Sequence, residues 1–221
     1  LARTLDIRVP EERYVDLREE GFPLPLKYPS LIKPNVGAGS FGMTKNCVVY
    51  NDDQARSYMH WLAGKLDPPE ALIQEFLSGR EFTVGLIGNP HTSLTVLPVA
   101  EIDYSELPQD LPPVFTYEAK FEATSPYWQK LRHKRADLSE SDYVEIVEVS
   151  KRLYRRLGIR DYARIDFRMG SDNKIRLLDV NPNPTWYADS RMAMMAEWAG
   201  HSYSDMLENI LDSSLKRYAK N

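Results

Sequence analysis

The chain has 221 residues, 43% hydrophobic and 27% charged, which is the composition of an ordinary folded protein and not of a disordered segment. A formal net charge of −4 argues against an extended nucleic-acid or anionic-membrane surface, and the sequence holds no apolar run of the ~18 residues that a membrane span needs. Because Cys47 is the only cysteine, an internal disulfide and a thiolate metal cluster are both excluded, and we expect a cytoplasmic protein.

The first part of the chain predicts strands, one helix and one Gly-rich turn. Strands are expected over residues 30–33, 46–50, 71–77, 81–87 and 94–102. The turn at 35–42 joins the first two strands, so it is neither a Walker loop nor a dinucleotide fingerprint, both of which open a helix. Asn51 is expected to cap a helix that runs to about Leu66, before Pro68 and Pro69.

The segment over residues 103–138 has the weakest pattern. Four prolines lie within 107–126, and a Lys, Arg and His cluster follows at 130–135. Structureless segments of this length are uncommon in compact domains unless they bind or cover something, so we expect a long functional loop.

The remaining part predicts three helices around one strand pair. One helix is capped by Ser139 or Ser141 and ended by Gly158, one covers 190–198, and one runs from Ser202 or Ser204 to Leu215. Their apolar residues repeat on one face, as core-packing helices require, and they do not indicate cofactor sites.

Residues 164–184 predict a strand hairpin that carries three oxygen ligands. Gly-Ser-Asp-Asn at 170–173 has turn chemistry between two apolar runs. Asp179 and Asn181 share one face, whereas Asp166 lies on the partner strand, where the register decides whether it faces them. If it does, the site suits Mg²⁺, which takes one or two carboxylates and completes its shell with water and phosphate. The alternative is a solvated hairpin with acidic residues near its turn.

Further features lie in order along the chain: Lys33 before the Gly-rich turn, the segment over 74–81, Lys120, and Arg164. Each alone has an ordinary interpretation, since a strand lysine is usually a solvated charge and a Gly-rich turn is usually only a turn. Together they supply backbone donors, cations and metal ligands, which phosphoryl transfer needs.

These residues resemble motifs of the ATP-grasp superfamily, most closely of its D-alanine:D-alanine ligase-like branch. The matching stretches are Ile32-Lys-Pro-Asn-Val-Gly-Ala-Gly-Ser-Phe-Gly-Met43, Glu75-Phe-Leu-Ser-Gly-Arg-Glu-Phe-Thr-Val84, Tyr117-Glu-Ala-Lys-Phe121, Ala163-Arg-Ile-Asp-Phe167 and Leu178-Asp-Val-Asn181. The resemblance implies an α+β fold of two subdomains whose mostly antiparallel sheets sandwich the nucleotide. The small subdomain, with the Gly-rich loop, is expected over residues 1–77 and the large one, with the metal site, over 78–221.

The resemblance also implies a role for each matched residue. ATP phosphates would meet Lys33, Lys120 and the closing loop of Gly39, Ser40, Phe41 and Gly42. Adenine and ribose would meet Gln74, Glu75, Phe76, Leu77 and Glu81. Asp166, Asp179 and Asn181 would hold Mg²⁺, expected as two ions, with Mn²⁺ as an alternative. Arg164, Lys120 and Ser40 would be catalytic, with Arg164 stabilising the transferring phosphoryl group.

The implied reaction is ATP-dependent ligation of a carboxylate and an amine through an acyl phosphate, with release of ADP and phosphate. Acceptor-substrate residues are implied at Asn183, Thr185, Ser190 and Arg191. There the sequence departs from the ligases, since Asn-Pro-Thr-Trp-Tyr replaces their Ser-Pro-Gly-Met-Thr turn and Arg191 replaces a leucine. Asp179 likewise stands where a glutamate is usual.

Two alternatives stay open from the sequence: a truncated or non-catalytic ATP-binding module that needs an N-terminal domain, and a small-molecule kinase on the same fold. The family carries an α/β domain before this part, and nothing before Leu1 supplies it, so we expect a fragment or a chain that needs a partner domain. Expected partners are ATP and amino acid-like carboxylate and amine substrates, without nucleic acid or membrane. A homodimer is left open.

Overall fold

The computed structural model describes residues 1–19, 21–37, 39–90 and 93–219, and the chain divides into two compact units. The large unit comprises Leu1–Val9, Gly79–Ile102 and His133–Asn221, and the small unit comprises Pro10–Ser78 and Asp103–Arg132. This division falls one residue after the predicted boundary at 77, but residues 1–9 and 103–132 lie in the other unit than predicted. Core contacts explain the difference, because Ile7 is buried in the core of the large unit and Val114 in the core of the small unit.

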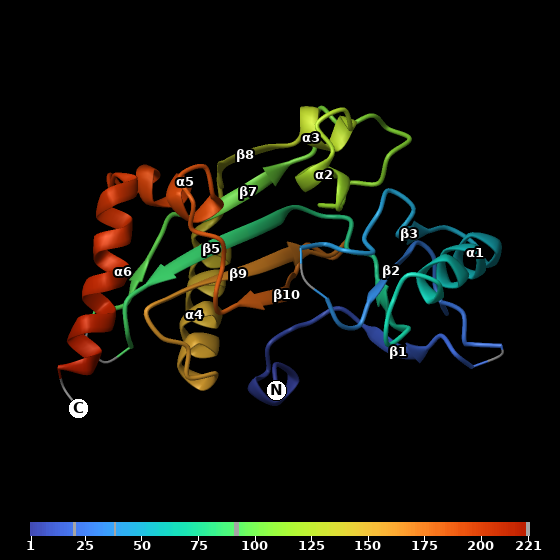
Figure 1. The fold of residues 1–221 in the computed structure, drawn as a ribbon, viewed down its shortest axis with the longest axis horizontal. Helices are drawn as coiled ribbons and strands as arrows, with labels where there is room; N and C mark the ends of the chain where they lie inside the picture. The colour runs from blue at the N-terminus through green and yellow to red at the C-terminus, as the bar shows by residue number, and fades with distance from the viewer. Residues whose placement is uncertain (20, 38, 91–92, 220–221) are drawn as a thin grey trace. The chain divides into compact units, whose positions relative to one another are not determined.

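The large unit is built on one sheet (Figure 1), with the strand order β10-β9-β5-β7-β8 and with β6 paired to β5. The strands are β5 (Glu81–Ile87), β6 (Thr95–Val96), β7 (Ala100–Asp103), β8 (Arg132–Arg135), β9 (Tyr162–Met169) and β10 (Ile175–Asn181). β5 pairs antiparallel with β6, β7 and β9. The single strand predicted over 94–102 is therefore wrong: it is split into β6 and β7 around Pro98, which has no N–H to give to a ladder.

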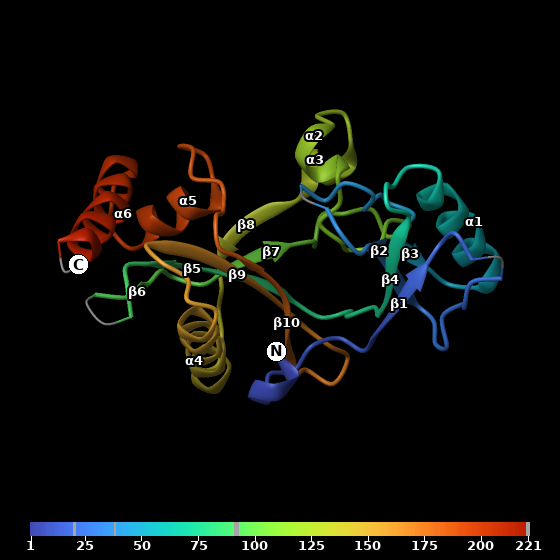
Figure 2. The ribbon, with the colours of Figure 1, turned by 60° about the horizontal axis from the view of Figure 1, so that its bottom comes forward.

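Helices cover both faces of this sheet (Figure 2). They are α4 (Glu140–Arg156), α5 (Arg191–Trp198) and α6 (Tyr203–Tyr218), and a 3₁₀ helix, Arg3–Leu5, precedes the first strand. α4 packs on one face through Ile146, Leu153 and Tyr154, while α5 and α6 share a second core on the other. Ser139 and Ser202 are the caps that the sequence had left open, and each accepts a backbone N–H in the first turn.

The small unit has a four-stranded antiparallel sheet in the order β1-β4-β2-β3. Its strands are β1 (Glu12–Asp16), β2 (Ser30–Pro34), β3 (Val48–Val49) and β4 (Glu70–Glu75). α1 (Asp52–Ala63) packs on it through Ala55, Met59 and Leu62. Asn51 caps this helix as predicted, because its side chain accepts the Gln54 N–H at 2.9 Å.

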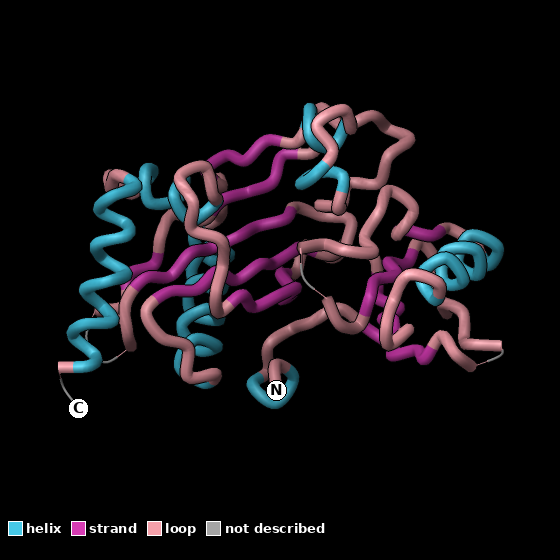
Figure 3. The backbone as a smooth tube through the Cα atoms, in the orientation of Figure 1, coloured by secondary structure: helices cyan, strands magenta, loops and turns pink. Residues whose placement is uncertain are grey.

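The expectation of one long loop over residues 103–138 is wrong in part. Two short helices, α2 (Glu118–Phe121) and α3 (Pro126–Lys130), interrupt the loop (Figure 3), and β8 follows them. Ser125 caps α3, and Pro126 occupies its first position, where a missing N–H costs nothing. A proline that suggested a loop therefore starts a helix.

The α+β class with mostly antiparallel sheets is confirmed. Across the described ranges, no helix combines the length and the apolar character needed to cross a bilayer.

Candidate functional site

The β9–β10 hairpin places the predicted metal ligands on one face of the large unit's sheet. Asp179 lies opposite Asp166, and Asn181 lies opposite Arg164. A register shift just before Asp179 sets this pairing. Residues opposite each other in antiparallel strands project to the same face, so the register that the sequence could not fix brings these side chains together.

Asp166 is the centre of a closed hydrogen-bond cluster. Arg164 donates from Nε to Oδ1 and from Nη2 to Oδ2, each at 2.9 Å. The Thr83 hydroxyl donates to Oδ1, and the Asn181 amide donates to Oδ2 at 3.1 Å. The Arg164 and Asp166 side chains are only 15% and 14% exposed, so their ion pair is largely removed from water. We call these four residues the Asp166 cluster.

The electrostatics of the cluster keep Asp166 charged. Burial alone would raise the pKa of Asp166, but the Arg164 guanidinium, the Arg191 charge and the Thr83 hydroxyl outweigh burial and hold the pKa below its ordinary value. The carboxylate is therefore ionised at neutral pH, which is the form that can bind a cation.

The oxygen atoms of Asp166, Asp179 and Asn181 are the kind of ligand that a hard divalent cation prefers. Asp179 is exposed, and its Oδ1 accepts the Val180 N–H at 2.9 Å. The amide nitrogen of Asn181 donates to Asp166, so the amide oxygen of Asn181 can still act as a metal ligand. No cluster of three or more His, Cys, Asp or Glu side chains with metal-binding geometry occurs in the part of the chain that the structure describes. A cation here would thus have two carboxylates and would take its other ligands from amide, water or phosphate oxygens, as Mg²⁺ does.

Two residues of this region were not predicted from the sequence. Thr83 lies opposite Asp166 on β5 and is 1% exposed; its signal was a hydroxyl within an apolar strand. His133 lies on β8, where burial, and then the charges of Arg191 and Arg164, lower its pKa to about 4. Its only signal was the basic cluster at 130–135, which suggests a solvated surface.

Glu81, the predicted ribose contact, lies two residues before Thr83 and thus on the same face of β5. It accepts a hydrogen bond from Arg168 Nη1 at 2.9 Å, and Arg168 Nε donates to the Gly79 carbonyl at 3.1 Å. Glu81 and Arg168 are 8% and 4% exposed. No local pattern indicated that Glu81 forms a buried ion pair with Arg168.

The predicted acceptor residues occupy the loop from β10 into α5. Asn183 accepts a hydrogen bond from the Tyr162 hydroxyl, and Thr185 is exposed. Ser190 is buried and caps α5. Arg191 begins α5, and its charge helps to lower the pKa of both Asp166 and His133.

In the small unit, the Gly-rich loop follows Lys33 at the end of β2. Gly39, Ser40 and Gly42 have positive φ angles of 67°, 63° and 73°. A Cβ on Gly42 would lie 2.5 Å from Pro34 Cγ, so this position requires glycine on steric grounds as well. Phe41, between them, is 49% exposed.

The Gly-rich loop is tied to the segment that carries Lys120, within the same unit. The Tyr117 N–H donates to the Met43 carbonyl at 2.7 Å, and the Lys45 N–H donates to the Glu118 carboxylate at 3.0 Å. The small unit therefore brings together two sets of predicted phosphate ligands that lie far apart in the sequence.

The predicted adenine residues lie at the end of β4 and just after it. Gln74 is 5% exposed, and its amide donates to the Glu12 carboxylate at 2.8 Å. Leu77 is buried, while Glu75 and Phe76 are half-buried. The hydrogen bond to Glu12 therefore fixes the orientation of the Gln74 side chain.

The predicted residues therefore fall into two sets, each within one unit. Lys33, residues 39–42, residues 74–77 and Lys120 lie in the small unit, and the metal, ribose and acceptor residues lie in the large one. Two antiparallel α+β units, one with a Gly-rich loop after a strand lysine and one with an oxygen-ligand hairpin, define an ATP-grasp protein.

Comparison with known proteins gives the particular family. Residues 15–212 match the family described as D-ala D-ala ligase C-terminus, and the chain belongs to this family.

Individual relatives agree with this family. The uncharacterized protein y4sG of Sinorhizobium fredii is 30% identical over 225 residues, which cover 93% of this chain and 62% of that protein. The D-alanine–D-alanine ligase of Bordetella petrii is 30% identical over 210 residues, which cover 94% of this chain and 60% of the ligase. The structure of the Bacillus anthracis D-alanine–D-alanine ligase complexed with ATP has a TM-score of 0.72 at 21% identity, covers 99% of this chain and 64% of that one, and shows the shared fold. This chain spans about 60% of the length of these two curated relatives.

Proposed function

We propose that this chain is the ATP-binding and metal-binding part of an ATP-dependent carboxylate–amine ligase. The observation that carries the proposal is the Asp166 cluster facing Asp179 on the β9–β10 hairpin, in a chain of the D-alanine–D-alanine ligase family. The relative from Bordetella petrii is a ligase of this kind, and the Bacillus anthracis ligase binds ATP.

The small unit supplies the nucleotide ligands in this proposal. Lys33, Lys120 and the N–H groups of residues 39–42 bind phosphate oxygens, and residues 74–77 bind adenine. The hydrogen bonds between the Gly-rich loop and the Lys120 segment support this role, because they hold the two segments side by side. Glu81, in the large unit, binds the ribose.

The large unit supplies the charge for phosphoryl transfer. Asp166, Asp179 and Asn181 would hold Mg²⁺, as two ions or with Mn²⁺ in its place, and the bound metal would supply positive charge against the phosphates. Arg164 keeps Asp166 ionised and oriented, and in this proposal its charge also stabilises the transferring group. Ser40, in the small unit's loop, is the further catalytic residue of the proposal.

The proposed ligation needs no nucleophile from the protein, because the two substrates supply the attacking atoms. A substrate carboxylate oxygen attacks the γ-phosphorus, ADP leaves, and an acyl phosphate forms. An amine then attacks the acyl carbon, phosphate leaves, and the amine loses one proton. Asn183, Thr185, Ser190 and Arg191 hold the acceptor, an amino acid-like molecule.

Phosphate release from ATP and Mg²⁺, measured with a panel of amino acids, tests the proposal. Release that requires both a carboxylate and an amine supports a ligase. Stabilisation of the chain by ATP without any release favours a non-catalytic ATP-binding module, and transfer to a hydroxyl favours a small-molecule kinase. Cytoplasmic location, the absence of nucleic-acid and membrane partners, and a homodimer remain predictions.

A further inference from the structure

The loop between β10 and α5 presents two exposed aromatic side chains. Trp186 is 49% exposed and Tyr187 is 56% exposed. Both directly follow the predicted acceptor residues Asn183 and Thr185, and both belong to the turn in which the sequence departs from the ligases. Neither aromatic residue belongs to the predicted nucleotide, metal or acceptor sets.

This loop is anchored at both ends to the large unit. Pro184 is buried at one end, and Ser190 is buried at the other, where it caps α5. The Ser190 N–H donates to the Tyr187 carbonyl at 2.9 Å, which closes a turn over residues 187–190. An anchored loop loses less conformational freedom when a ligand binds, so its aromatic side chains are a pre-organised surface.

The Tyr162 hydroxyl joins Trp186 to the acceptor residue Asn183. It donates to the Asn183 side-chain oxygen, and a hydrogen bond from Trp186 opposes the rise in the pKa of Tyr162 that burial causes. The indole N–H is the only polar group of the tryptophan side chain, so this N–H is the donor. The indole is therefore held at its edge, while the side chain stays half-exposed.

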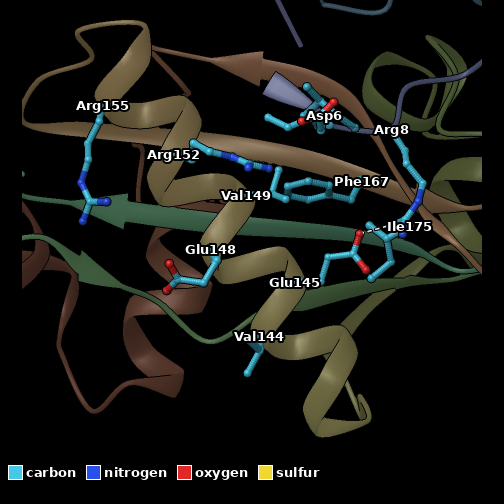
Figure 4. Close-up of a pocket in the computed structure, with 12 residues that line it drawn as sticks. Asp6, Arg8, Val144, Glu145, Glu148, Val149, Arg152, Arg155, Phe167 and Ile175 are labelled. Atoms are coloured by element: carbon cyan, nitrogen blue, oxygen red, sulfur yellow. Dashed lines mark hydrogen bonds and ion pairs between the residues drawn. The ribbon is translucent and has the colours of Figure 1, made fainter. Parts of the chain in front are cut away.

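Tyr162 also relates Trp186 to the Asp166 cluster. Strand side chains alternate, so Tyr162 and Arg164 project from the same face of β9 as Asp166. Phe167, which lies beside α4 in Figure 4, projects from the other face and is buried in that core. Tyr162 is two residues, about 7 Å, from Arg164 along the strand. A substrate whose reacting group lies at Arg164 therefore has Trp186 within reach of its side chain.

We propose that Trp186 is a specificity-determining residue of the acceptor site and that it selects an amino acid with an aromatic side chain. The ring of the acceptor packs against the exposed part of the indole, and Tyr162 is the positioning residue that holds the indole in place. Aromatic pairs gain free energy from buried area and from their stacking geometry. A methyl side chain is too small to cover the indole, so it would leave this surface wet.

This specificity rests on the proposed function, because it takes the acceptor site to lie at Asn183 and Thr185. A cationic side chain can also lie over an indole ring, so lysine is the competing class of acceptor. Binding and turnover are therefore measured separately, with aromatic, small and cationic amino acids.

Calorimetric titration of the chain with phenylalanine, alanine and lysine, each as both enantiomers, tests the inference at saturating Mg²⁺ and ADP. We expect phenylalanine to bind roughly tenfold or more tightly than alanine of the same enantiomer, and lysine to bind no better than alanine. Phenylalanine should also shift the NMR signal of the Trp186 indole N–H, which is identified by its loss in Trp186→Phe.

Substitutions of two exposed tryptophans give the control. Trp186→Ala should abolish the preference for phenylalanine over alanine. Trp61→Ala removes a tryptophan of α1 that is 40% exposed, and it should leave the preference intact. Trp186→Phe keeps an aromatic ring and should keep most of the preference, which guards against a folding defect in the alanine variant. Tyr162→Phe removes the hydroxyl that holds the indole and should give an intermediate loss.

Four results would overturn the inference: no binding of any of these amino acids, equal affinities for phenylalanine and alanine, a preference for lysine, or equal effects of the alanine substitutions at 186 and 61. Phosphate release from ATP, measured in separate samples, tests the proposed function. A phenylalanine preference without release would support the binding specificity and count against the ligase. Release with alanine that phenylalanine cannot match would support the ligase and overturn the specificity.

Discussion

The Asp166 cluster and the Gly-rich loop differ in which groups determine their geometry, side chains in the first and the backbone in the second. In the cluster, side chains from three strands satisfy one another, and the central ion pair is largely hidden from water. In the loop, backbone conformation determines the geometry, because residues 39, 40 and 42 have positive φ angles. The side chain of Phe41 is half-exposed.

This difference shows where each region should be sensitive to mutation. The cluster depends on electrostatic balance, because a buried carboxylate without its cation is costly. The loop depends on backbone conformation, because glycine accepts positive φ without strain. The same kind of substitution should therefore have unequal effects in the two regions.

The largest expected effect is on the cluster. Arg164→Met leaves Asp166 without its guanidinium and should lower the free energy of unfolding by about 3–5 kcal/mol. Urea unfolding at pH 7 measures it. Arg18→Met is the matched control, since Arg18 makes the same bidentate pair with a carboxylate two residues away but is exposed, and its loss should be much smaller. Similar losses in both variants would mean that burial does not strengthen the cluster's dependence on charge.

A second effect concerns pH at the cluster's edge. The pKa of His133 in the folded chain, about 4, lies below its ordinary value of 6.5. Between these two pH values the unfolded chain therefore binds a proton at His133 and the folded chain does not. The stability contributed by neutral His133 is thus complete above pH 6.5 and is lost as the pH falls toward 4, by about 3 kcal/mol. In His133→Gln, unfolding measured across this range should depend less on pH. An unchanged pH profile would show that His133 does not titrate differently in the folded and unfolded chains.

A smaller effect is expected in the loop. Gly42→Ala combines a positive φ with a clash against Pro34 and should cost about 2 kcal/mol. Gly39→Ala has a similar φ, but its Cβ would lie 3.9 Å from Phe121, so only the backbone cost of about 1 kcal/mol remains. Thermal unfolding of both variants separates the two terms. Equal losses would show that packing against Pro34 does not constrain the loop.

Much of the fold was predictable because its signals are local. The caps at Asn51, Ser139 and Ser202 and the Gly-Ser-Asp-Asn turn follow from side chains that bond to nearby backbone, which any sequence window contains. The segment over 103–138 was misjudged, because prolines mark helix starts as well as loops.

The candidate site was only partly predictable, since its geometry depends on contacts between distant strands. The sequence placed Asp179 and Asn181 on one face, but only the register of β9 and β10 sets them against Asp166. Thr83 and Arg168 join the site through the β5–β9 pairing, which no local pattern reveals. Likewise, His133 looked solvated within a basic cluster, because burial is a property of the folded chain.

We propose that the β9–β10 hairpin holds the metal ion used with the nucleotide. Its most direct test is titration calorimetry of ATP with and without Mg²⁺, comparing Asp179→Ala with Asp172→Ala, which removes an exposed carboxylate from the turn of the same hairpin. We expect Mg²⁺ to strengthen ATP binding by the unaltered chain and by Asp172→Ala, and we expect Asp179→Ala to lose this Mg²⁺ dependence while remaining folded. An Asp179→Ala protein that keeps the full Mg²⁺ dependence would contradict it.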